Sequence, residues 1–81
     1  MNDLLVMFFT YGFKDEDKFE HPNYICTLKV KSYDRFLNFI KAAKGESIVL
    51  KGNEYTIDDI IIEYDGEEYD IFHMNVYCWS N

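Results

Sequence analysis

Basic residues are scarce in the second half of this 81-residue chain. Residues 46–81 carry one Lys and nine Asp or Glu, a net charge of −8, whereas residues 1–45 carry seven basic and six acidic residues, a net charge of +1. The whole chain carries −7. Because an acidic surface repels phosphates, this shortage argues against a conventional DNA- or RNA-binding module and against binding to anionic lipid.

Cysteine and proline are also scarce, and the start of the chain has no signature of export. The first three residues lack the positive charge of a signal peptide, and the apolar run over residues 4–13 is shorter than the roughly 20 residues of a membrane helix. Two cysteines without an export signal indicate reduced thiols rather than a disulfide framework. We therefore expect a cytoplasmic protein.

Glycine and proline are too few to divide the chain. One proline and four glycines, with no visible linker or repeat, predict a single compact domain over residues 1–81. The 48% hydrophobic content, with 19% aromatic residues, is too apolar for a disordered chain. A folded protein is the expectation.

Strand patterns dominate the first 31 residues. Residues 4–13 form a continuous apolar and aromatic run, which is typical of a strand buried on both faces. Residues 14–23 form a charged connection. Residues 24–31 then alternate in polarity, which predicts a half-buried strand. The face expected to be apolar carries Tyr24, Cys26, Leu28 and Val30.

One helix is predicted over residues 33–44. Ser32 is a suitable N-cap and Gly45 a suitable stop, and lysines near the end complement the helix dipole. Apolar residues recur with helical spacing, which predicts a buried stripe. The stripe consists of Tyr33, Phe36, Leu37, Ile40 and Ala43, with Phe39 beside it.

Short strands separated by turns are predicted after the helix. Gly52-Asn53 divides residues 46–57 into two strands, and Asp65-Gly66 joins residues 60–64 to a final strand that begins at Glu67. The predicted fold class is α+β, with a single helix packed on a largely antiparallel β-sheet. The approximate element order is β-β-α-β-β-β-β.

Carboxylates gather around the predicted Asp65-Gly66 turn. A two-residue turn there would place Glu63 opposite Glu68, with Asp70 on the same face, although like charges across a strand pair repel. The cluster can be a solvated tip that keeps the protein soluble, or a surface that binds a basic partner. Divalent-metal binding is a further alternative, but no EF-hand loop spacing is present.

The final strand has a second, aromatic face. Its even positions, from Phe72 to Cys78, are apolar and predict the core, whereas its odd positions include Tyr77 and Trp79. Tyr and Trp are enriched at the energetic centres of protein interfaces. This face can therefore be a surface for a partner or for self-association, or it can lie beneath the helix.

Chemistry-bearing motifs are absent from the sequence. There is no nucleophile elbow, P-loop, dinucleotide fingerprint or HExxH helix. His21 and Cys26, like His73 and Cys78, are five residues apart and suggest zinc, but residues five apart in a strand point to opposite faces. A Cys/His dyad drawn from these four residues stays an alternative. We expect no enzyme, catalytic residue, cofactor or metal.

These patterns predict a small acidic binding protein. It would inhibit a nucleic-acid-binding or nucleic-acid-processing protein by presenting a phosphate-mimicking carboxylate surface. Small host-directed phage inhibitors, which have this size and charge, are a class-level analogy. The alternative is a non-catalytic assembly or homodimerisation subunit that uses the aromatic face of the final strand. The expected partner is a protein with a basic surface, without direct binding of nucleic acid or membrane. The predicted contacts are Asp58, Asp59, Glu63, Asp65, Glu67, Glu68, Tyr69, Asp70, Tyr77 and Trp79.

Overall fold

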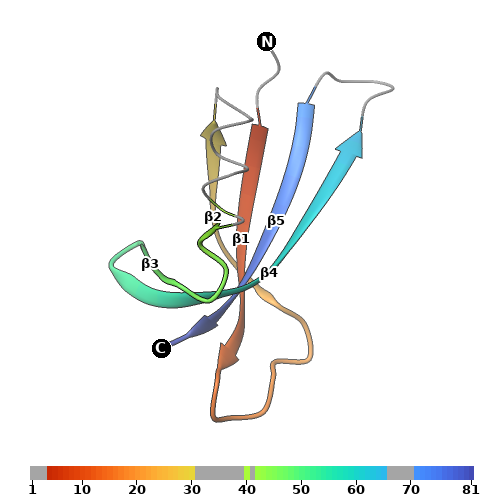
Figure 1. Cartoon of the computed structure of the whole chain (residues 1–81). Coiled ribbons are helices and arrows are strands. Elements are labelled where there is room, and N and C mark those ends of the chain that lie inside the picture. Colours follow the sequence, from red (N-terminus) through yellow and green to blue (C-terminus); the bar gives the residue numbers. More distant parts are fainter. Residues whose placement is uncertain (1–3, 31–39, 41, 66–70) are drawn as a thin grey trace.

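A curled five-stranded sheet makes up the described part of the molecule. The computed structural model describes residues 4–30, 40, 42–65 and 71–81 (Figure 1). In the order β2-β1-β5-β4-β3, the central pair, β1 and β5, is parallel and the neighbouring pairs are antiparallel. The strands are β1 (Leu4–Phe13), β2 (Asn23–Val30), β3 (Ser47–Leu50), β4 (Asn53–Asp65) and β5 (Ile71–Ser80).

The predicted α+β architecture, a helix packed on a largely antiparallel sheet, is wrong. The described residues form a curled mixed sheet instead. Most of the helix predicted over residues 33–44 lies outside the described residues, which omit 31–39 and 41. The parallel pairing escaped the sequence pattern because β1 and β5 lie at opposite ends of the chain, and local periodicity does not record which distant strands pair.

The two faces of the sheet differ in burial. The even residues from Leu4 to Gly12 in β1 and from Met74 to Cys78 in β5 are buried, and the odd residues between them are half-buried. β1 therefore alternates and is not buried on both faces as predicted. The predicted core face of β5 is confirmed at Met74, Val76 and Cys78, which have no exposed surface. The remaining buried apolar residues are Leu4, Val6, Phe8, Ile40, Leu50, Tyr55 and Ile57.

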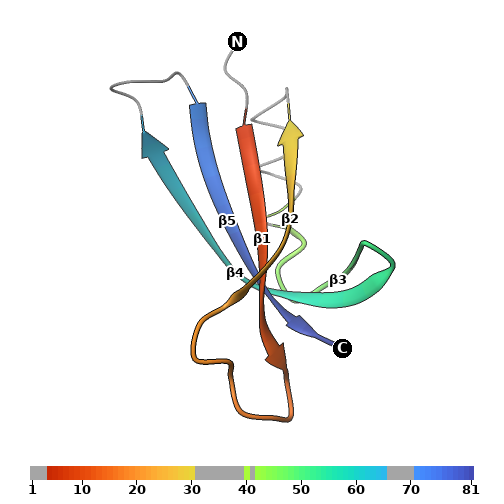
Figure 2. The ribbon, with the colours of Figure 1, turned by 180° about the vertical axis from the view of Figure 1, so that it is seen from behind.

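The core face is also covered by chain outside the sheet. Ile40 is buried in the core and Ala43 packs against it. Residues 42–46 lie in front of the sheet in Figure 1 and behind it in Figure 2. Gly45 N–H donates to the Ile57 carbonyl over 2.8 Å, and Ile57 N–H donates to the Glu46 carbonyl over 3.0 Å. These bonds hold the segment before β3 against β4.

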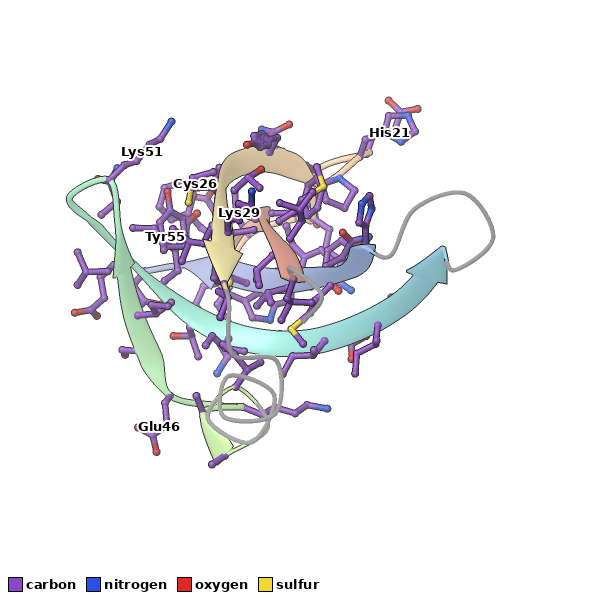
Figure 3. All side chains as sticks on the ribbon, turned by 90° about the horizontal axis from the view of Figure 1, so that it is seen from above. His21, Cys26, Lys29, Glu46, Lys51 and Tyr55 are labelled. Atoms are coloured by element: carbon purple, nitrogen blue, oxygen red, sulfur yellow. The ribbon has the colours of Figure 1, made fainter. Side chains whose placement is uncertain are left out.

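β3 and β4 are joined by a two-residue turn at Lys51-Gly52, one residue earlier than predicted. Both turn residues have positive φ, 51° at Lys51 and 81° at Gly52, as a type I' turn requires. Leu50 therefore pairs with Asn53. From this turn, near the Lys51 label of Figure 3, β4 sweeps in a long arc across the sheet.

The register of β4 and β5 overturns the predicted Asp65-Gly66 turn. Glu63 pairs with His73 and Asp65 pairs with Ile71, so five residues separate the two strands where two were expected. The predicted pairing of Glu63 with Glu68 is therefore wrong. Residues 66–70 lie outside the described residues. An Asp-Gly pair favours a tight turn, but pairing along the whole strand sets the register.

Near the end of β1, the ring of Phe19 packs against Gly12. Gly12 has a φ of +111°, and a Cβ placed there would lie 3.1 Å from the ring of Phe19. Phe19 N–H donates to the Tyr11 carbonyl over 2.8 Å, which returns the chain toward the sheet after β1. The absence of a side chain at Gly12 thus positions the connection between β1 and β2.

Replacing Gly12 tests this packing. We expect Gly12→Ala to lower the free energy of unfolding by more than about 2 kcal/mol, because positive φ and the Phe19 contact both oppose a Cβ. Gly52→Ala is the matched control, since Gly52 also has positive φ but no atom within 4 Å of an added Cβ. Urea unfolding of both variants measures the difference, and equal losses would contradict a role for Phe19.

Candidate aromatic interface

A continuous run of aromatic rings crosses the sheet face opposite the core. The ring centroids of Phe9 and Tyr77 are 5.4 Å apart and those of Tyr11 and Tyr77 are 5.6 Å apart, both in stacked arrangements. Trp79 lies 5.0 Å from Tyr11, and Tyr24 meets Phe9 edge-on at 6.0 Å. We call these five residues, contributed by β1, β2 and β5, the aromatic face. Figure 2 shows the ribbon of β2, β1 and β5 from the side opposite residues 42–46.

The pairing of β1 with β5 brings these rings together. The two strands run parallel with Phe9 opposite Tyr77 and Thr10 opposite Cys78, so their odd residues share one face. Aromatic pairs in such geometry each contribute about 0.5–1.5 kcal/mol beyond the area they bury. The rings are half-buried apart from Tyr24, which is exposed. The face therefore combines structural packing with accessible ring surface.

A bulge in β2 adds Tyr24 to the aromatic face. Cys26 pairs with Phe8 and Tyr24 pairs with Phe9, which leaves Ile25 as the extra residue. The prediction that Tyr24 shares a face with Cys26 is therefore wrong. The Tyr24 hydroxyl shares a hydrogen bond with the Thr27 hydroxyl along the same face.

A second bulge, in β4, places acidic residues beside the rings. Ile57 pairs with Cys78 and Asp59 pairs with Tyr77, so Asp58 is the extra residue. Without the bulge, strand alternation would turn Asp59 toward the core. The bulge keeps Ile57 buried in the core while Asp59 lies next to Tyr77 and Asp58 is exposed. Asp59 Oδ1 also accepts a hydrogen bond of 2.9 Å from Ile60 N–H.

The two carboxylates act electrostatically on Tyr11. Burial is the largest cause that raises the pKa of Tyr11 above 10, and the negative charges of Asp58 and Asp59 raise it further. A tyrosinate beside two carboxylates is unfavourable, so the neutral phenol is the stable form. The acidic pair of β4 therefore makes this end of the aromatic face attractive to positive charge.

A lysine from the β1–β2 connection already occupies that position. Lys18 Nζ lies 4.7 Å from the centroid of the Tyr11 ring and 5.4 Å from that of Trp79. Both distances are within the range of cation–π interaction. A cation therefore lies on two aromatic rings, and one of them, Tyr11, is acted on by two carboxylates.

The predicted contact residues separate into two groups. Asp58, Asp59, Tyr77 and Trp79 come together at the aromatic face. Glu63 and Asp65 belong to the far end of β4, where the structure describes the backbone but not their side chains. The predicted residues Glu67, Glu68, Tyr69 and Asp70 lie outside the described residues.

Four contributors to the site were missed by sequence reasoning: Phe9, Tyr11, Lys18 and Tyr24. The odd spacing of Phe9 and Tyr11 was the signal available for two of them, but the continuous apolar run concealed the alternation. Tyr24 depends on a bulge. Lys18 depends on the path of a connection that has no periodic pattern.

Catalytic and metal-binding arrangements do not emerge among the described residues. They contain no group of three His, Cys, Asp or Glu that could hold a metal ion. Burial raises the pKa of the Cys78 thiol to about 11, which disfavours a reactive thiolate at neutral pH. His21 points away from the body of the molecule in Figure 3.

No helix in the described ranges is both long and apolar enough to cross a membrane.

A shallow pocket at the ends of β1, β4 and β5 contains none of the predicted contacts. It is lined by Phe13, Asn53, Glu54, Tyr55, Ser80 and Asn81.

Comparison of the chain with protein-family models, curated proteins and solved structures finds no match.

Neutralising the acidic pair tests the electrostatic coupling to Tyr11. We expect Asp58→Asn/Asp59→Asn to lower the pKa of Tyr11 while leaving it above 10, because burial persists. Because the folded pKa is raised, the stability that Tyr11 contributes is present below pH 10 and is lost as pH rises through the folded pKa. The double variant should lose less stability over that range.

NMR titration of the tyrosine ring carbons, with the Tyr11 signal assigned by Tyr11→Phe, measures this pKa. Asp15→Asn/Glu46→Gln is the charge-matched control, because both residues are exposed and neither contributes to the Tyr11 shift. An unchanged Tyr11 pKa in the Asp58/Asp59 variant would contradict the proposed proximity.

Proposed function

We propose that this chain is a small, non-catalytic acidic binding protein that engages a basic protein surface through the aromatic face and Asp58–Asp59. The rings would supply contact area that loses water on binding, and the carboxylates would select a positively charged partner. The proposal includes a cytoplasmic location, in which the free thiols of Cys26 and Cys78 stay reduced.

The position of Lys18 is the observation that carries this proposal. Its ammonium group lies on the rings of Tyr11 and Trp79, and Asp58 and Asp59 act electrostatically on Tyr11. An intramolecular cation at this position supports the view that a partner's cation would be accepted there. The net charge of −7 adds long-range attraction for a basic protein.

We further propose that the partner handles nucleic acid and is inhibited on binding. The basic sites of such proteins accept phosphates, and carboxylates could occupy the same positions. Asp58 and Asp59 lie suitably beside aromatic anchors for this role. The other carboxylates in the proposal are Glu63, Asp65, Glu67, Glu68 and Asp70, with Tyr69 beside them.

Trp79 makes this proposal directly measurable, because it is the single tryptophan of the chain and belongs to the aromatic face. We expect an arginine-rich peptide to change Trp79 fluorescence saturably and an acidic peptide of equal length to leave it unchanged. Added salt should weaken the binding. Asp58→Asn/Asp59→Asn should bind the basic peptide roughly five- to ten-fold more weakly.

Asp15→Asn/Glu46→Gln is the control for the lost charge. It has the same net charge as Asp58→Asn/Asp59→Asn but an intact site, so it should bind the basic peptide more tightly than that variant. Equal weakening in the two double variants would count against a specific acidic site and would leave only general acidity. If no peptide binds but light scattering shows a dimer that Trp79→Ala abolishes, the alternative of a homodimerisation subunit replaces the proposal.

A further inference from the structure

Lys18 is held over the aromatic face by the backbone around it. The connection after β1 begins with a turn in which Glu16 N–H donates to the Phe13 carbonyl over 3.1 Å. It then returns to the sheet through the 2.8 Å bond from Phe19 N–H to the Tyr11 carbonyl. Lys18 directly precedes this anchor, so its side chain starts within reach of Tyr11 and Trp79.

The contact that Lys18 makes is one that another cation can replace. Its ammonium contacts the faces of two rings and makes no hydrogen bond or salt bridge to a carboxylate of the described residues. An ammonium on an exposed ring is held weakly, because it retains most of its water. A guanidinium is planar, stacks on aromatic rings and can donate two parallel hydrogen bonds to a carboxylate.

We infer that Tyr11 and Trp79, together with Asp58 and Asp59 of the neighbouring strand β4, form a binding site for one arginine side chain of the protein partner, and that Lys18 is an internal occupant which this arginine displaces. This inference rests on the proposed function and adds two things to it. It names the group that the site recognises, and it assigns Lys18 the role of a tethered competitor.

A tethered competitor reduces the apparent affinity of the site by the fraction of molecules in which it is bound. Removing it should therefore tighten binding without adding any contact. Because cation–π contacts at exposed sites are weak, the expected gain is about three- to six-fold. A residue that only stabilised the rings would give the opposite result, since its loss would disorder the site.

The test compares Lys18→Met with Lys14→Met. Both variants remove one positive charge from the same exposed connection, and Met keeps much of the apolar stem. The probe is a capped glycine peptide with one central arginine, titrated at low salt and followed by Trp79 fluorescence and by the indole N–H signal in NMR spectra. Lys18→Met should bind this peptide about three- to six-fold more tightly than Lys14→Met. The same peptide with lysine in place of arginine should bind more weakly to both.

Thermal unfolding of both variants shows whether the fold is retained, and Tyr11→Phe provides a site that keeps its ring without its hydroxyl. Equal or weaker arginine binding by Lys18→Met would overturn the competitor role, even where the arginine-rich peptide still binds wild type and the proposed function stands. Equal binding of the lysine peptide would overturn arginine recognition. Failure of every basic peptide to bind wild type would reject the proposed function itself.

Discussion

The parallel pairing of β1 with β5 is the constraint on which both faces of this molecule depend. The two strands lie at the centre of the sheet, and their register pairs Phe8 with Val76 and Phe9 with Tyr77. Because side chains alternate along each strand, this register directs the even residues of both strands to the core and the odd residues to the aromatic face. A shift of either strand by one residue would expose the core and bury the rings.

The two bulges preserve this separation where the sequence would otherwise break it. In β4, Ile57 and Ile60 are three residues apart and both pack at the core, which regular alternation does not allow. One extra residue, Asp58, restores both to the same face and leaves Asp59 next to Tyr77. In β2, the extra residue Ile25 similarly turns Tyr24 toward Phe9. Bulges of this kind redirect side chains near binding sites. Here one adds Tyr24 to the aromatic face and the other places Asp59 next to it.

The sequence predicted local alternation well and long-range pairing poorly. The core face of β5 and the placing of Tyr77 and Trp79 opposite it followed from a period of two. The predicted turn, Gly52-Asn53, lies one residue later than the observed turn, Lys51-Gly52. Both pairs contain the glycine that a tight turn needs, so the sequence did not distinguish them. The wrong turn at Asp65-Gly66 had a larger effect, since it set the supposed carboxylate pairs.

The acidic and aromatic parts of the site were each visible in the sequence, but their proximity was not. Asp58 and Asp59 were predicted as contacts of a carboxylate surface, and Tyr77 was predicted on the separate aromatic face of the final strand. Their contact depends on the register of β4 against β5 and on the bulge at Asp58. Tyr11 joins them only because β1, from the other end of the chain, pairs with β5. No pattern within a short window contains that information.

The end of β1 connects the stability of the sheet to the occupancy of the cation site. Thr10 Oγ1 accepts a 3.1 Å hydrogen bond from Gly12 N–H and lies 2.7 Å from Ser80 Oγ, which links the ends of β1 and β5. Gly12 then leaves room for the ring of Phe19. Lys18 is thus positioned by main-chain bonds and packing, because a cation–π contact is too weak to order a long side chain alone. The backbone places Lys18 at the site, but the site holds its ammonium group only weakly. Lys18 is therefore suited to exchange with a cation that also binds the carboxylates.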